Sequence, residues 1–356
     1  MSWVETKFPG RIRPYNEDMI ISVKRRDELV SRLREKTMYI SDASFNGLKL
    51  RLYSNIDHVF DFWRENWFPA CPSVRPHGLV YSMEDPELTS ADLYEKPVEK
   101  PEINAGAVYN PETHTLIVVN NDYYGETKPT SLGLAADILE DCFGVLSVHG
   151  ASAAIEGKGY LLIGPTNAGK TTHSYGPVIF HPKGEFHQDD WIFVNFEEER
   201  AIGYASEKQF YMRTNCIANY PWLEEEFRRS KLENVSPDAL REDFLPPFPR
   251  VMIDPRRIVT PEKVVDQIRI LKTILLKRDP EDKRVVRSLD PEEAVEVLRE
   301  APEQWHNNYL ITFGGRKERR RAELFKKLFE RAEPYQLNTT ASVETARNLL
   351  IKIVLS

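Results

Sequence analysis

The stretch YLLIGPTNAGKTTHSYG, residues 160–176, decides which fold the chain is expected to have. Its hydrophobic beginning ends at Ile163 and leads into the pattern G-x-x-x-x-G-K-[ST], which runs from Gly164 to Thr171. A strand that leads into this pattern, with a helix after it, is the setting of a phosphate-binding loop. The sequence therefore predicts a strand, a phosphate loop and a helix in direct succession.

Each part of this predicted phosphate loop has a physical task. The glycines let the backbone bend so that its N–H groups point at the phosphates, and the helix adds the positive end of its dipole. Lys170 would reach the β- and γ-phosphates, and the hydroxyl of Thr171 would hold Mg²⁺. The residues expected to contact the nucleotide are Gly164, Pro165, Thr166, Asn167, Ala168, Gly169, Lys170, Thr171 and Thr172.

Two neighbouring aspartates follow the loop at a short distance. Asp189 and Asp190 stand in HQDDW, directly before the apolar run WIFV. Neighbouring residues of an extended segment point to opposite sides. We therefore expect one carboxylate to face a metal ion and the other to meet a different partner.

A histidine precedes the loop. His149 ends the hydrophobic run VLSVH, and EGKG at residues 156–159 is a tight turn before the strand that feeds the loop. A hairpin at that turn folds the two strands side by side. This arrangement predicts that His149 lies near the γ-phosphate.

Taken together, His149, GPTNAGKTT and HQDD resemble the HPr kinase/phosphorylase and phosphoenolpyruvate carboxykinase superfamily. The resemblance spans roughly residues 105–275, and GKTTHS is similar to the carboxykinase loop, which reads GKTTLS. It implies an α/β fold class: a P-loop kinase core with a mixed sheet, plus a smaller N-terminal α+β domain. It also implies ATP, or another nucleoside triphosphate, and Mg²⁺.

The resemblance assigns catalytic roles. His149 and Asp189 would assist deprotonation of an acceptor hydroxyl, and Lys170 would hold the phosphates. Arg213 would stabilise charge on the moving phosphoryl group, because such chemistry depends on positioning and electrostatics.

The resemblance also implies a metal site. The second aspartate, Asp190, would share the metal and base work with its neighbour, and Thr171 would contribute its hydroxyl. Glu207 in SEKQFYMRTN is the best match for the acidic residue that completes the Mg²⁺ shell.

Some features of the superfamily are missing. The glycine-rich signature of HPr kinases does not follow the aspartate pair, so HPr is not the expected acceptor. The additional metal-binding lysine and histidine of the carboxykinases have no match, so oxaloacetate decarboxylation is not expected either. Gly176-Pro177 is expected to end the loop helix after about two turns, because proline lacks the N–H that a helix needs.

Other segments predict the organisation of the chain. We expect three parts: an N-terminal α+β domain at residues 1–145, a P-loop kinase core at 146–300, and a C-terminal α/β extension at 301–356. Within the first part the patterns predict a strand from Leu48, a helix at 56–67 capped by Asn55, a hairpin within 105–121, and a helix at 131–143 that Gly144 ends.

Composition excludes several classes of protein. The 48 basic and 55 acidic residues leave a net charge of −7, which argues against nucleic acid or membrane partners. The three cysteines form no C-x-x-C pair and no secretion signal is visible, so a cytoplasmic location is expected. The basic run at 316–327 predicts a solvated helix face, with an anion or partner site as the alternative. The family resemblance makes a homo-oligomer plausible.

These patterns favour a kinase that transfers the γ-phosphate of ATP to a hydroxyl acceptor, either a small molecule or a protein serine. Two alternatives stay open: a nucleotide-sensing module without catalysis, and a general P-loop ATPase. Structural roles are expected for His173, His181, His187 and Glu126.

Overall fold

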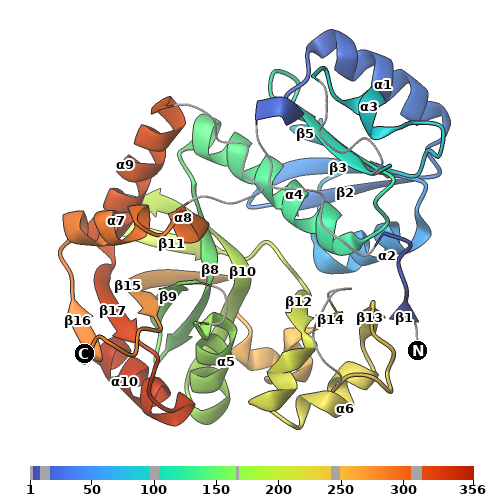
Figure 1. Cartoon of the computed structure of the whole chain (residues 1–356). Coiled ribbons are helices and arrows are strands. Elements are labelled where there is room, and N and C mark those ends of the chain that lie inside the picture. The colour runs from blue at the N-terminus through green and yellow to red at the C-terminus, as the bar shows by residue number, and fades with distance from the viewer. Residues whose placement is uncertain (1–2, 9–16, 97–103, 166–167, 242–248, 306–314) are drawn as a thin grey trace. The chain divides into compact units, whose positions relative to one another are not determined.

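A computed structural model describes residues 3–8, 17–96, 104–165, 168–241, 249–305 and 315–356 (Figure 1). These residues form two compact units. Unit 1 comprises the described residues of Met1–Ile138 and Glu207–Asp254. Unit 2 comprises those of Leu139–Ser206, Pro255–Asn307 and Gly314–Ser356. This division differs from the expected one, because residues 207–254 group with the N-terminal unit. The C-terminal extension, which was expected to pack on the core, groups with the core.

Unit 2 is built on a mixed sheet, as expected. Its strands are, in order across the sheet, β11 (Arg200–Tyr204), β10 (Gly184–Glu197), β8 (Leu146–Ile155), β9 (Lys158–Ile163), β15 (Gln267–Lys277), β17 (Glu333–Asn338) and β16 (Val286–Ser288). The strands β9, β15 and β17 run parallel to one another, and the other neighbours are antiparallel. β11 also pairs with β15, so the strands from β11 to β15 close on themselves.

The helices of unit 2 are α5 (Lys170–Phe180), α7 (Pro291–Arg299), α8 (Pro302–Trp305), α9 (Gly315–Arg331) and α10 (Val343–Leu355), with a π-helical turn at Leu139–Phe143 and 3-10 turns at Pro255–Arg257 and Pro261–Lys263. α9 forms because Leu324, Phe325, Leu328 and Phe329 share one face, which packs with α7 over the sheet core. α5 packs against α10 (Figure 1).

The expected early end of the loop helix is wrong. α5 is 11 residues long and continues through Pro177 to Phe180. Pro177 cannot donate to the carbonyl of His173, one turn earlier. The hydroxyl of Tyr160 on β9 donates to that carbonyl at 3.2 Å instead, so no acceptor is lost. This tertiary hydrogen bond could not be seen in the local sequence.

Unit 1 holds two sheets. The larger has the strand order β4 (Phe68–Pro69), β2 (Tyr39–Phe45), β3 (Leu48–Ser54), β5 (Gly78–Met83), β7 (Thr115–Val119) and β6 (Gly106–Asn110). The smaller has the order β1 (Trp3–Val4), β13 (Lys231–Glu233), β14 (Arg250–Ile253) and β12 (Phe210–Arg213). The strand from Leu48 and the antiparallel β6–β7 hairpin confirm the predictions.

The helices of unit 1 are α1 (Val23–Glu35), α2 (Asp57–Asn66), α3 (Ser90–Leu93), α4 (Tyr124–Ile138) and α6 (Leu223–Arg228), with 3-10 turns at Glu17–Met19 and Thr214–Ala218. α4 begins before the predicted helix, and the chain turns at Gly144, where φ is +66°. No helix among the described residues is long and apolar enough to cross a membrane.

Asn55 is not the N-cap of α2, contrary to the prediction. The cap position is Ile56, and no side chain caps the helix. Asn55 instead exchanges two hydrogen bonds with the backbone of Glu84 at the end of β5, at 2.9 and 2.8 Å. Two bonds to a neighbouring strand end satisfy the amide side chain better than a single cap bond would.

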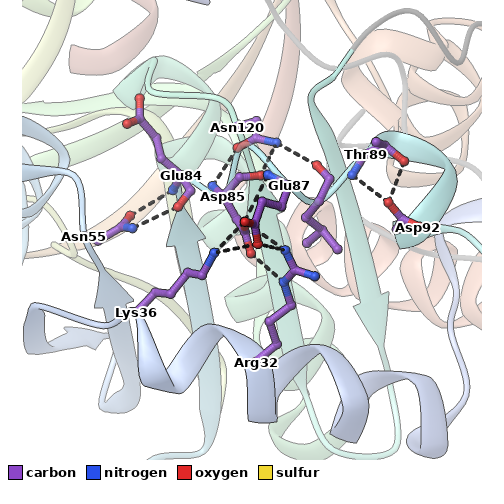
Figure 2. A network of polar contacts seen from close by, with 10 residues as sticks. Arg32, Lys36, Asn55, Glu84, Asp85, Glu87, Thr89, Asp92 and Asn120 are labelled. Atoms are coloured by element: carbon purple, nitrogen blue, oxygen red, sulfur yellow. Dashed lines mark hydrogen bonds and ion pairs between the residues drawn. The ribbon is translucent and has the colours of Figure 1, made fainter.

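Asp85 is the centre of a polar network in unit 1 (Figure 2). Its side chain is 0% exposed and accepts hydrogen bonds from Arg32 Nε at 2.6 Å and Lys36 Nζ at 2.7 Å. The hydrogen bond from Arg32, reinforced by Lys36, lowers the pKa of Asp85 to about 2 against the opposing effect of burial. The ion pairs therefore hold α1 against the end of β5.

Asp85→Asn is expected to lower the free energy of unfolding at pH 7 by about 2 kcal/mol. Because the folded-state pKa lies below the ordinary value of 3.8, the stabilisation is present above about pH 4 and is lost as pH falls towards about 2. Urea unfolding between those pH values should show a slope that Asp85→Asn removes. Asp238→Asn, whose side chain is 99% exposed, should leave it unchanged. An unchanged slope in Asp85→Asn would contradict the assignment.

Candidate functional site

Three adjacent strands of unit 2 bring most of the predicted site residues together. β8 lies between β9 and β10 (Figure 1). On β8, Gly150 pairs with Ile163 at the end of β9 and with Asp190 on β10. His149, the start of the loop and the aspartate pair therefore lie in one row across the sheet. The hairpin that predicted this arrangement is present, with its turn at Glu156 and Gly157.

Two glycines of the predicted phosphate loop are required by its backbone. Gly169 has φ +96°, and a Cβ there would lie 3.0 Å from Cδ2 of His173. A Cβ at Gly164 would lie 2.8 Å from the carbonyl oxygen of Leu276. The loop thus turns sharply into the N-terminus of α5, where backbone N–H groups and the helix dipole suit an anion. Thr166 and Asn167 lie outside the described residues.

The loop is held by its own lysine, Lys170, and by Thr339, the residue that follows β17. Lys170 Nζ donates to the carbonyl oxygens of Gly164 at 2.7 Å and Pro165 at 3.3 Å. Thr339, which follows β17, donates to the carbonyl of Ala168 at 3.1 Å. The charged lysine head therefore lies on the loop itself, where a bound phosphate would offer it a stronger acceptor.

Asp189 is buried beside the loop. Burial raises the pKa of Asp189 to about 6, and the charge of Asp190 adds to the rise. Three interactions lower the pKa of Asp189 in opposition to this: a hydrogen bond with Thr171, the backbone N–H of Asp190, which donates to Oδ1 of Asp189 at 3.0 Å, and the charge of Lys170. A carboxyl group with a pKa in this range is suited to accept a proton near neutral pH.

Asp190 has an unusual backbone, with φ +73°. Its carboxylate lies 3.7 Å from Nε2 of His149, and the imidazole ring stacks on Trp191 at 5.3 Å between centroids. The two aspartates contact different protein groups, but this segment is not regularly extended as the prediction assumed. That one carboxylate faces a metal ion stays a prediction. A non-glycine residue held in this region costs of order 1 kcal/mol, which is typical of functional sites.

The donor set fits nucleotide and Mg²⁺ in chemical type. The hydroxyl of Thr171 and the carboxylates of Asp189 and Asp190 are hard oxygen ligands, which Mg²⁺ prefers. Within the described ranges, no group of three or more His, Cys, Asp or Glu side chains could hold a metal ion by itself.

Two predicted site residues belong to unit 1. Glu207 pairs with Nζ of Lys128 at 3.0 Å and accepts from Nδ2 of Asn66 at 2.8 Å. Arg213 ends β12, opposite Arg250. The roles of Glu207 and Arg213 at the loop, which the family resemblance implies, stay predictions.

Two residues near the site were missed by the sequence analysis. Thr339 fixes the loop, and Ser152 Oγ lies 2.7 Å from Nδ1 of the buried His187. A signal for Thr339 exists, because it is polar and directly follows a strand. The carboxyl ends of the parallel strands β9 and β17 share one edge of the sheet, so Thr339 arrives beside the loop.

The four residues expected to be structural are placed as follows. His173 lies under Gly169 on α5, and burial lowers the pKa of His173 to about 4. Burial likewise lowers the pKa of His187 to about 3. Glu126 is buried in α4 of unit 1, and Nδ1 of His181 accepts from the backbone N–H of Lys183 at 3.2 Å.

Comparison with known proteins finds similar solved structures but no similar sequence. No protein family and no curated protein matches the sequence. A solved structure, the Hpr(Ser) kinase/phosphatase from Coxiella burnetii, is similar over 59% of this chain and 97% of its own, with 12% identity and a TM-score of 0.33. A likeness with so low a TM-score carries no conclusion about fold or activity.

Proposed function

We propose that the chain is an ATP- and Mg²⁺-dependent kinase that transfers the γ-phosphate to a hydroxyl of a small molecule or a protein serine. One observation carries the proposal: a glycine-bounded loop with Lys170 at its helix N-terminus lies beside the buried carboxylate of Asp189. Phosphate binding needs only the loop, whereas a buried carboxylate next to it suits proton transfer.

The described loop residues would bind the triphosphate. Lys170 would exchange the carbonyls of Gly164 and Pro165 for phosphate oxygens, a charge-assisted contact that is stronger. Thr171 and Asp190 would hold Mg²⁺, which neutralises charge on the phosphates. Thr339 would keep the loop in shape, because its hydroxyl bonds the carbonyl of Ala168.

Asp189 would take the proton of the acceptor hydroxyl. The acceptor oxygen then forms a bond to the γ-phosphorus while the bond from phosphorus to the ADP oxygen breaks. His149 would orient Asp190, because its Nε2 lies 3.7 Å from that carboxylate and its ring is held by Trp191.

The test is transfer of labelled phosphate by the purified full chain. ATP and GTP carrying a labelled γ-phosphate would be incubated with Mg²⁺ and a panel of hydroxyl compounds and serine-containing proteins. We expect the label on one acceptor class, with ADP or GDP formed only slowly when water replaces the acceptor. Binding without any turnover would establish a sensor, and rapid hydrolysis indifferent to every acceptor would establish an ATPase. Either result would overturn the kinase.

A further inference from the structure

A cavity of about 510 Å³ lies in unit 2, away from the phosphate loop. Its walls come from the segment before β8, from the end of β10 and from α9, the helix of the basic run at 316–327. Phe143 and Phe196 contribute aromatic surface, and Arg320 and Lys327 contribute positive charge. A volume of this size is usual for a small-molecule site.

The wall of this cavity carries two cations and two carboxylates, and Lys327 is the cation that is best placed to meet an anion. Lys327 Nζ lies 4.6 Å from the ring centroid of Phe196, and no ion pair with a carboxylate is present for it among the described residues. Arg320 reaches Glu323 only at 3.9 Å. The remaining carboxylate of the wall, Glu197, accepts a hydrogen bond from the hydroxyl of Tyr204 at 2.7 Å. The ammonium group suits the negative charge of a ligand, and the aromatic side chains of the wall suit a flat apolar ring.

Arg320 extends the positive surface. It also lines an adjoining cavity of about 240 Å³, together with Arg316, Arg319 and the carboxylates of Asp141 and Glu323. Arg316 lies 3.6 Å from Asp141, so the excess positive charge there comes from the arginines at 319 and 320. Arg316 is 83% exposed and Arg320 is 42% exposed, so the basic run is solvated, as its pattern predicts. The same side chains also line the two solvent-open cavities, which keeps the alternative prediction of an anion site open.

We infer that the cavity under α9 binds a small organic anion, a phosphate or carboxylate carried on an aromatic ring, as a site separate from the phosphate loop. The distance between the cavity and the phosphate loop follows from the length of β8. Val145 at the cavity and His149 at the loop are joined by extended chain spanning roughly 13 Å. A ligand in the cavity therefore cannot be the phosphate that Lys170 would hold, and the inference stands whether or not the chain is a kinase.

Phenyl phosphate is the probe that tests this site, titrated calorimetrically into the full chain carrying Lys170→Met to suppress binding at the phosphate loop. We expect one site per chain with a Kd below about 1 mM. Lys327→Met in the same background should weaken binding by about tenfold, because it removes the charge and keeps the apolar stem. Lys326→Met is the matched control, since that neighbour pairs with Glu292 at 2.8 Å and should bind as before.

Two further titrations test whether both the charged group and the aromatic ring of the ligand are recognised. Inorganic phosphate and benzyl alcohol should each bind far more weakly than phenyl phosphate, because each lacks one half of the recognised ligand. The inference is overturned if phenyl phosphate does not bind, if Lys327→Met binds it as tightly as its parent, or if inorganic phosphate binds equally well. Loss of phenyl phosphate binding in Lys170→Met relative to the wild-type chain would place the ligand at the loop and would also overturn it.

Discussion

Lys170→Met is expected to lower phosphoryl transfer by about a thousandfold, and Asp189→Asn by about a hundredfold or more. The two changes should separate binding from chemistry. Lys170 carries the charge that meets the phosphates, so Lys170→Met should weaken nucleotide binding as well as turnover. Asp189→Asn should bind nucleotide almost as tightly, because the amide keeps a hydrogen-bonding oxygen for Thr171, and should lose mainly kcat.

Loss of folding does not explain such an effect at Asp189. Burial raises the pKa of this carboxyl, which means that its charged form destabilises the fold. A neutral amide of the same shape avoids this desolvation cost. Lys183→Met is the matched control for the lysine, because its side chain is 71% exposed. Transfer of labelled phosphate and binding of a fluorescent nucleotide would be measured on all variants. Turnover in Lys170→Met within twofold of the wild-type rate would rule out the proposed site.

Local sequence patterns predicted the hairpin that brings His149 and the start of the loop to neighbouring strands. The turn at residues 156–159 predicts a hairpin. In a hairpin, the length and type of the turn determine which residues of the two strands lie opposite one another. The sequence therefore predicted that His149 lies on the strand beside the loop, while the register that sets Gly150 opposite Ile163 came from the structure. The third strand, which carries Asp189 and Asp190, could be predicted as a strand, but its pairing with β8 and the left-handed backbone of Asp190 could not.

The features that sequence reasoning missed depend on contacts between distant segments. Pro177 stays within a helix because Tyr160 on another element supplies the missing hydrogen bond. Residues 207–254 join unit 1 because β13 pairs with β1 and the carboxylate of Glu207 has partners on α2 and α4. Glu233, for example, accepts from the backbone N–H of Tyr124 at 2.7 Å. No periodicity within the segment itself encodes such partners.

The pairing of Glu207 with Lys128 leads to the second large expected effect, on stability. The two side chains are 0% and 2% exposed, and their ion pair measures 3.0 Å. Asn66 donates to the same carboxylate at 2.8 Å and accepts from the hydroxyl of Tyr124 at 2.7 Å. Removing one partner of a buried ion pair costs about 3 kcal/mol or more, because the other charge loses its compensation away from water.

Glu207→Ala is therefore expected to lower the free energy of unfolding of unit 1 by about 3 kcal/mol, measured by urea unfolding. The double variant Lys128→Met/Glu207→Leu should recover most of that loss, because well-packed apolar side chains avoid the desolvation of both charges. Glu225→Ala, an acidic residue of the same segment with a 67% exposed side chain, should change stability by less than about 0.5 kcal/mol.

A further variant, Glu207→Gln, decides between two roles for Glu207. If it completes the Mg²⁺ shell, as the family resemblance implies, Glu207→Gln should shift the Mg²⁺ dependence of phosphoryl transfer while the urea unfolding curve stays in place. If its task is to hold Lys128, the unfolding curve should move and the Mg²⁺ dependence should not. The burial of both side chains and the bond from Asn66 favour the second outcome, because a carboxylate already satisfied by an ammonium and an amide must give up those partners to reach a metal ion.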